Sequence, residues 1–387
     1  MTWHLFLAIV AASAGVFLFL TTLWEGFETI VLPRSVTRRL RLTRLFYITS
    51  WRATSGVARR SRMGGKRELF LSFYGPLSLP LLLGLWAVPL VLSFALMDWA
   101  LGPGAYRSPV GSHGFDSMVY SSGVTFFTLG YGDITPRTGP ARGLAVLEAG
   151  VGFGFLALVI GYLPVLYQAF SRREAIISRL DGRCGSPPSA GEMLRRHAQG
   201  DSMPALTGLL AEWEQWASET LESHLSYPVL PYYRSQHDHQ SWVAALTTIM
   251  DTCAVALVGA SGAPAWQIGL QWQARMTFAM ARHAVIDLCY VFHAAPVAPE
   301  PERLTAEGLA QMRARLAAAG LPLCDGPEDN RALAELRHLY EPYVQALADF
   351  FLFDLPPWQG DPKAQDNWQT SAWDSVLNMD MEHLHFH

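Results

Sequence analysis

One short stretch of the chain has the residue types and spacing to do chemistry with its own backbone. It reads Thr128-Leu129-Gly130-Tyr131-Gly132-Asp133, with glycines on both sides of an aromatic residue. Glycine adopts conformations closed to other residues, so such a segment can turn all its carbonyl oxygens one way. Non-helical backbone at membrane depth is tolerated only where it lines a water-filled path or is buried in protein. The elements around this stretch therefore decide what it can do.

Three long apolar runs surround it, at residues 3–32, 77–97 and 144–167. About 20 apolar residues span the hydrocarbon core of a bilayer, so each run predicts a transmembrane helix. No Lys or Arg precedes the first run, which disfavours a signal peptide. Residues 115–127 are too short to span and suit a re-entrant pore helix, and Asp116 is placed to cap its start.

The order helix, pore helix, loop, helix over residues 77–170 resembles the two-helix pore-loop module of the potassium channel superfamily, and residues 128–133 resemble its selectivity filter. One departure is Leu129, where valine or isoleucine is common. The resemblance implies that K⁺ is bound by the Thr128 hydroxyl and by the carbonyl oxygens of Thr128, Leu129, Gly130 and Tyr131. A ring of such loops needs four chains. The expected partners are therefore K⁺, the lipid bilayer and a homotetramer, with no cofactor beyond K⁺ ions.

Three polar residues are candidates for supporting this filter. Asp133 lies at its outer end, and Tyr120 matches the position where the family often has an aromatic partner for that aspartate. A simple turn role for Asp133 stays open. Glu148 is an ionisable residue inside the third apolar run. It either stabilises the filter from behind or lies near the outer interface and reaches water.

The third run also holds a candidate gating hinge. Gly152 lies twenty residues after Gly132, which matches the hinge glycine of the family, and Pro164 further along can kink the helix. Gly150 and Gly154 flank the first of these at every second residue. Small residues also allow membrane helices to pack closely, and this alternative stays open.

The distribution of charged residues along the chain predicts its orientation in the membrane. Residues 33–68 hold eleven cations and one acid, and positively charged loops stay in the cytoplasm. Residues 171–387 carry 15 basic and 26 acidic residues, against 14 and 7 in the first 170. We therefore expect a multi-pass protein of the cell (inner) membrane with 33–68 and 171–387 in the cytoplasm. Residues 42–57 are either an interfacial helix on anionic lipid or a solvated linker.

The chain is thus expected to be an all-α membrane protein, a pore-loop potassium channel module joined to an α-helical cytoplasmic domain. Its expected divisions are an N-terminal transmembrane helix (1–32), a basic linker (33–76), the pore module (77–170, with filter 128–133), a linker (171–191) and the helical domain (192–387). Helical patterns in that domain cover about 192–225, 238–260, 265–293, 303–319 and 329–353.

Several motifs in the second half are candidate sites. The segment 241–260 is apolar, but Asp251 inside it favours a buried core helix over a fourth span. His237 and His239 are potential metal ligands, but they point to different sides of a helix, which favours a helix-cap and loop role. His383, His385 and His387 at the chain end are either a weak metal-binding tail or, the favoured alternative, part of a disordered terminus. Five tryptophans suit core or intersubunit contacts: Trp213, Trp216, Trp242, Trp266 and Trp272.

These observations predict a potassium-selective channel, not an enzyme, gated through the helical domain. The alternative is a non-conducting or weakly selective cation-channel relative acting as a sensor or scaffold. No spaced arginines mark a voltage sensor in the first run, no clustered catalytic constellation is visible, and the composition excludes a nucleic-acid-binding tail.

The charge argument predicts a topology that cysteine labelling can test. An Arg52→Cys variant should react with a membrane-impermeant thiol reagent only from the cytoplasmic side, and His113→Cys only from outside. Labelling of position 52 from outside would overturn the orientation.

Overall fold

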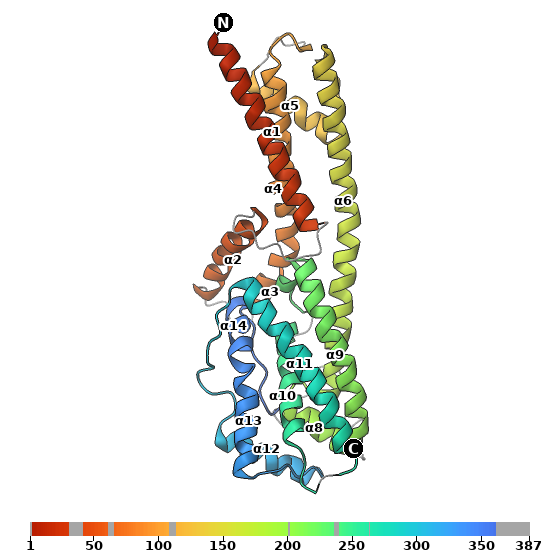
Figure 1. The fold of residues 1–387 in the computed structure, drawn as a ribbon, viewed down its shortest axis with the longest axis vertical. Coiled ribbons are helices and arrows are strands. Elements are labelled where there is room, and N and C mark those ends of the chain that lie inside the picture. The colour runs from red at the N-terminus through yellow and green to blue at the C-terminus, as the bar shows by residue number, and fades with distance from the viewer. Residues whose placement is uncertain are drawn as a thin grey trace, which may run out of the picture. The chain divides into compact units, whose positions relative to one another are not determined.

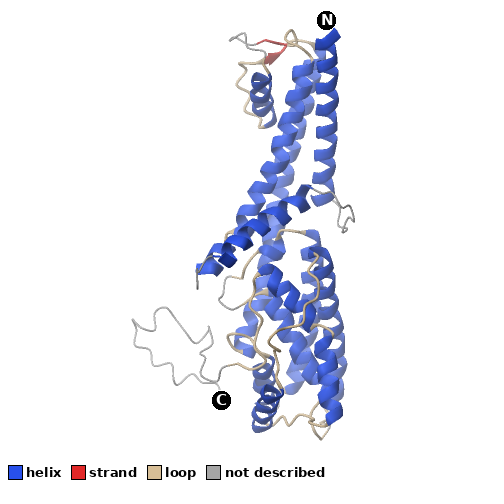
Figure 2. Cartoon of the chain, turned by 90° about the vertical axis from the view of Figure 1, so that its left-hand side faces the viewer, coloured by secondary structure: helices blue, strands red, loops and turns tan. Residues whose placement is uncertain are grey.

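The chain has two compact units, Met1–Gln168 and Ala169–His387, here called the membrane unit and the helical domain. The structure is a computed structural model that describes residues 2–30, 42–60, 66–107, 114–199, 202–235, 240–262 and 264–360. Both units are built almost wholly of helices, which confirms the expected fold class (Figure 1 and Figure 2).

Within the described ranges, three helices are long and apolar enough to cross a membrane: α1 (Thr2–Ile30), α4 (Tyr74–Ala100) and α6 (Gly139–Ile177). They coincide with the three predicted apolar runs, of which the last two residues of the first, 31 and 32, lie outside the described residues. The third helix is much longer than its run, with 39 residues in one element that continues through Pro164 into the helical domain. A proline inside a helix removes one backbone hydrogen bond, but the remaining bonds let the helix continue past it.

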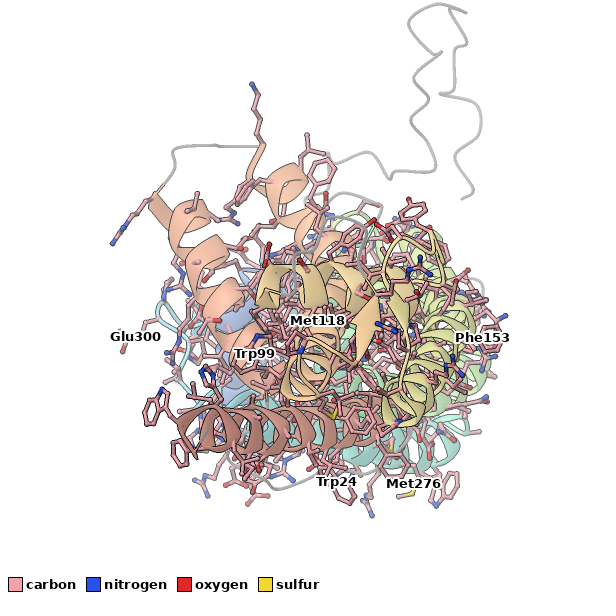
Figure 3. All side chains as sticks on the ribbon, turned by 90° about the horizontal axis from the view of Figure 1, so that it is seen from above. Trp24, Trp99, Met118, Phe153, Met276 and Glu300 are labelled. Atoms are coloured by element: carbon pink, nitrogen blue, oxygen red, sulfur yellow. The ribbon has the colours of Figure 1, made fainter. Side chains whose placement is uncertain are left out.

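Aromatic pairs mark the two ends of α1. The rings of Trp3 and Phe6 stack at 5.7 Å near its start, and those of Trp24 and Phe27 lie 6.0 Å apart near its end. All four side chains are exposed, and Figure 3 labels Trp24 beside α1. Twenty-one residues of helix separate the pairs, a rise of about 30 Å, which is the thickness of the hydrocarbon core. Tryptophans so placed are typical of the two membrane–water interfaces.

Close backbone contact holds α1 against α4. A Cβ added at Gly15 would lie 2.7 Å from the Ser93 carbonyl oxygen and 2.8 Å from the Met97 Cγ. Phe19 and Phe94 form an edge-to-face ring contact at 5.3 Å one turn further along. Small residues at such a crossing let two membrane helices approach closely, which supplies van der Waals contact where no hydrophobic effect acts.

The basic segment after α1 contains a helix rather than a solvated linker. Helix α2 (Leu42–Arg60) buries Tyr47 and Trp51, and the Trp51 ring meets Tyr74 edge-on at 4.9 Å. The Glu25 carboxylate near the end of α1 accepts a 2.9 Å bond from the Thr43 backbone N–H at the start of α2. A short helix, α3 (Lys66–Ser72), leads into α4. Residues 31–41 and 61–65, with several of the predicted cations, lie outside the described residues.

The segment between α4 and α6 carries the pore helix α5 (Phe115–Phe126) and a small antiparallel sheet. Strands β1 (Tyr106–Arg107) and β2 (Thr135–Pro136) pair with each other. The pore helix and the filter lie between them in the sequence, so this pairing joins the two ends of the segment. Strand β1 is fixed to α4 because the Tyr106 hydroxyl donates to the buried carboxylate of Asp98.

The helical domain is all-α in its described residues apart from an isolated β-bridge. After α6 its elements are η1 (Ser178–Leu180), α7 (Asp181–Cys184), α8 (Ala190–Ala198), α9 (Met203–Ser226), η3 (Leu230–Tyr232), α10 (Trp242–Val258), α11 (Gln267–Phe292), α12 (Ala306–Ala318), α13 (Pro327–His338) and α14 (Glu341–Phe351).

Two helix predictions and one linker prediction need correction. The pattern at 192–225 is two helices, because Pro204 starts α9 anew, and 329–353 is two helices, because Pro342 starts α14. The expected linker 171–191 is mostly helical, and its Leu180 and Cys184 are fully buried.

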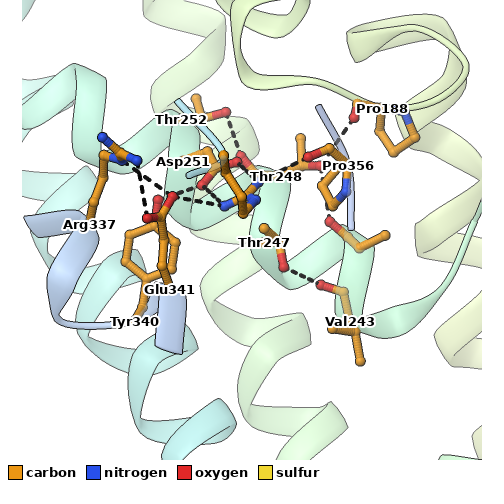
Figure 4. Close-up of polar contacts among 12 residues, drawn as sticks. Pro188, Val243, Thr247, Thr248, Asp251, Thr252, Arg337, Tyr340, Glu341 and Pro356 are labelled. Carbon is orange, nitrogen blue, oxygen red and sulfur yellow. Dashed lines mark hydrogen bonds and ion pairs between the residues drawn. The ribbon is translucent and has the colours of Figure 1, made fainter. Parts of the chain in front are cut away.

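Helix α10 is the buried centre of the helical domain, as predicted for 241–260. Its Asp251 is fully buried and pairs with Arg303 at 2.7 Å, and it also accepts a bond from the Tyr340 hydroxyl (Figure 4). Arg303 and Arg337 share Glu341 as a partner. Trp213, Trp216 and Trp242 lie in the core as expected, Trp266 is half-buried, and Trp272 is exposed, so it is no core residue.

The crossing of α1 and α4 predicts a matched pair of variants. Gly15→Ala should lower the free energy of unfolding of the purified protein by about 1–3 kcal/mol, because the new methyl group meets the backbone carbonyl oxygen of Ser93. Gly26→Ala, on the same helix with nothing within 4 Å, should leave stability unchanged or raise it slightly. Equal melting temperatures for the two variants would contradict the close crossing.

Candidate ion-conduction site

The two ends of the pore helix α5 differ in how they are held. Gly114, in an extended conformation, is its N-cap residue, so the predicted capping role of Asp116 is wrong; Asp116 lies in the first turn instead. There its negative charge still favours the positive end of the helix dipole. At the other end Phe126 is buried in an apolar cluster with residues of α1, α4 and α6, among them Phe19, Leu90 and Phe155.

The chain leaves α5 through a left-handed residue. Thr128 has φ of 56°, and its N–H bonds the Thr125 carbonyl at 3.0 Å, while the Leu129 N–H bonds the Val124 carbonyl at 2.9 Å. These two bonds form a Schellman motif, in which glycine usually fills the left-handed position. A threonine there costs conformational energy, which makes Thr128 a candidate functional residue.

The filter backbone alternates in handedness. Thr128, Gly130 and Gly132 have φ of 56°, 61° and 76°, whereas the intervening Leu129 and Tyr131 have no positive φ. Such alternation lets successive carbonyl oxygens face one side, instead of alternating as they do along a β-strand. Both glycines of the predicted motif are thus required by the conformation, and the resulting row of oxygens suits a cation without its water.

The outer end of the filter is tied back to the pore helix. The Tyr120 hydroxyl of α5 donates a hydrogen bond to the Asp133 carboxylate, the pairing that the sequence predicted. Asp133 Oδ1 also accepts a 3.0 Å bond from the Ile134 N–H, so the turn role left open is present as well. The carboxylate therefore fixes the exit of the filter and places a negative charge beside it.

Glu148 lies behind the pore helix and does not reach water. Its side chain is 1% exposed, and it is hydrogen-bonded to the Ser122 hydroxyl, which also bonds the Val91 carbonyl at 2.8 Å. A serine has one proton to donate, so both contacts are satisfied together when Glu148 carries a proton and donates to Ser122. A neutral carboxyl is also the cheaper form at membrane depth. This three-way contact links α4, α5 and α6.

Gly152 is where α6 meets the pore helix backbone. A Cβ at this position would collide with the carbonyl oxygen of Phe126, whereas Gly150 and Gly154 have nothing within 4 Å. The structure therefore shows the close-packing role that the sequence left open. Pro164 lies twelve residues further along α6, about 18 Å away, and is no part of this contact.

Three polar residues of the site were not predicted from the sequence. Asp98, Tyr106 and Ser122 were not singled out, although Asp98 is an ionisable residue near the end of an apolar run, which is a signal of function in membrane helices. His237, His239 and the three C-terminal histidines lie outside the described residues. Within the described ranges no group of three His, Cys, Asp or Glu side chains could hold a metal ion.

Comparison with known proteins supports an ion channel. Residues 81–168 match a family model described as "Ion channel", the two-helix channel domain, which confirms the pore-loop module predicted from the filter sequence. An uncharacterized membrane protein of Bacillus subtilis, YdjJ, is 21% identical over 202 residues, covering 51% of this chain. The chain matches 58% of the length of that relative. No solved structure matches significantly.

The contact at Gly152 predicts the outcome of two substitutions on one helix. Gly152→Ala should push the end of α5 out of place and reduce ion flux at least about tenfold, with impaired discrimination among cations. Gly154→Ala, with open space at its Cβ, should retain both flux and selectivity. Liposome flux assays on the two purified proteins make this comparison. A Gly152→Ala protein that changes only its open probability would favour the hinge role instead.

Proposed function

We propose that the chain is a potassium-selective channel in which four copies surround one pore and conduct K⁺ passively. The observation that carries the proposal is the filter backbone, with left-handed residues at 128, 130 and 132 and a threonine at the first of them. In this proposal the ligands are the carbonyl oxygens of residues 128–131 and the Thr128 hydroxyl. K⁺ exchanges its water for these oxygens, and no side chain titrates.

In a single chain the filter segment is exposed, and this exposure supports the need for several copies. Leu129 and Tyr131 are 55% and 67% exposed, and the backbone around them is not helical. Lipid cannot satisfy the N–H and carbonyl groups of such a segment, so it must face protein and a water-filled path. Cyclic symmetry supplies both, because identical loops then cover one another around a central axis.

In this proposal, selectivity for K⁺ over Na⁺ follows because the ring of filter carbonyl oxygens is held at a fixed size. The Asp133–Tyr120 bond holds the outer end, and the Glu148–Ser122 contact holds the pore helix.

We also propose that the helical domain lies in the cytoplasm and sets the open probability through α6. The alternative, a non-conducting or weakly selective relative used as a sensor or scaffold, gives a different result in the experiment below.

Gly130→Ala tests the filter directly. A Cβ at φ of 61° is strained although nothing lies within 4 Å, so the effect acts through the backbone alone. The variant should lose K⁺ flux and K⁺/Na⁺ selectivity in liposomes while its oligomer stays intact by native mass measurement. Gly123→Ala in α5, also with open space but without positive φ, is the matched control and should conduct. Unchanged selectivity in the Gly130→Ala protein would refute the proposal, and absence of flux from the unmodified protein would favour the scaffold alternative.

A further inference from the structure

The last turns of α6 are clamped by a buried arginine. The Arg173 side chain is 2% exposed, and its guanidinium donates to the carbonyl oxygens of Leu230 at 3.1 Å and Tyr233 at 2.8 Å. Its Nε pairs with Glu174 at 2.9 Å. The Arg173 carbonyl in turn accepts a 3.3 Å bond from the Trp216 indole. All of these partners belong to the helical domain, so the clamp joins α6 to α9 and η3.

One partner of the arginine is a histidine whose tautomer the contacts define. His224 of α9 is 1% exposed, and its Nδ1 lies 2.6 Å from the Thr220 carbonyl, so Nδ1 carries a proton. Its Nε2 lies 3.3 Å from Arg173 Nη1. Arginine can only donate, so Nε2 must be an unprotonated acceptor and the ring is neutral. Burial, and next the charge of Arg173, lower the pKa of His224 well below its ordinary value.

We infer that Arg173 is the positioning residue through which the helical domain sets the state of the pore, and that His224 makes this link sensitive to acid. The inference rests on the proposed channel function. Arg173 lies nine residues after Pro164 on the same helix, so whatever moves α9 and η3 moves the end of α6. The guanidinium is held by acceptors from two elements at once, which a flexible surface pair could not achieve.

Protonation of His224 would break this clamp. It removes the acceptor at Nε2 and places a second cation beside Arg173 in a buried site. The other charged group facing the pair is Glu174 on α6, already bonded to Arg173 Nε. Around the ring, α9 contributes Thr220 and Ser223 and α10 contributes the Trp242 ring at 4.8 Å, all neutral. Because the pKa of His224 is lowered by folding, the clamp loses stability as pH falls below about 6.5, the ordinary pKa of histidine.

The first test compares two buried histidines of the same domain. His197 on α8 also bonds the carbonyl four residues earlier, Met193 at 2.7 Å, and burial lowers its pKa, but that ring hydrogen bond stays within its own helix. His224→Gln keeps an acceptor for Arg173 but cannot titrate, and His197→Gln is the control. Full-length protein is reconstituted in planar bilayers, and open probability is recorded at cytoplasmic-side pH 7.5 and 5.5.

Acidification should shift the open probability of the unmodified protein by about tenfold, with K⁺/Na⁺ selectivity unchanged. The His224→Gln protein should show no shift, and the His197→Gln protein the full shift. An equal acid response in the His224→Gln protein, no response in the unmodified protein, or loss of the response in the His197→Gln protein would each overturn the inference.

The second test separates the clamp from conduction. Arg173→Gln should shift open probability at pH 7.5 in the same direction as acid does in the unmodified protein. Arg173→Lys, which keeps the charge but lacks the planar fork, should restore part of the original value. Hydrogen exchange of residues 169–177, corrected for the intrinsic effect of pH, should be about tenfold faster in the Arg173→Gln protein and in acid.

Hydrogen exchange tests the clamp and K⁺ current tests the channel function, so either result can be negative without the other. The exchange response without any K⁺ current would refute the proposed channel function and leave the clamp standing. K⁺ current without an exchange response, or an Arg173→Gln effect opposite to that of acid, would refute the clamp.

Discussion

The close approach of α6 to the backbone of α5, at Gly152 and Phe126, is the constraint on which the candidate pore depends. The filter has no hydrogen-bond ladder of its own, so its position is set by the end of the helix before it. That end is buried among side chains of α1, α4 and α6, and α6 can come close only because Gly152 has no side chain. The Schellman bonds at Thr128 and Leu129 then fix the direction in which the backbone leaves.

Polar contacts add to this packing in holding the pore helix and the filter segment in place. Ser122 and Glu148 hold the middle of the pore helix, Tyr120 and Asp133 hold the outer end of the filter, and Asp98 holds β1 through Tyr106. Each contact joins a helix to the filter segment or to another helix. Ser122, Glu148, Asp98 and Tyr106 are buried, and an unpaired polar group there is expensive, so these two pairs are retained once formed. Different elements therefore hold the pore helix, the outer end of the filter and the strand that precedes the pore helix.

The sequence predicted the unusual backbone of residues 128–133 because the signals for it are local. Two glycines flanking an aromatic residue, and an acid directly after them, specify a backbone path within six residues. The apolar runs likewise specify spans by length alone. Contacts between distant residues were harder to foresee. Nothing in the order of residues says that Ser122 meets Glu148, or that Gly152, rather than Gly150 or Gly154, touches Phe126. The helix breaks at Pro204 and Pro342 do have a local signal, a proline in the first turn of the new helix, but the predicted helical segments run across it.

The helical domain is suited to transmit a displacement because its own interior resists one. Asp251 has no exposure, and it is held by Arg303 and Tyr340 from two other segments. Breaking one partner of such a buried pair costs about 3–5 kcal/mol, so α10 and α14 move together. Arg173 uses the same physics at the end of α6, where a buried cation is held by carbonyl oxygens and a neutral ring. In the inferred link, a change in this rigid core reaches the end of α6 through the several polar contacts of Arg173.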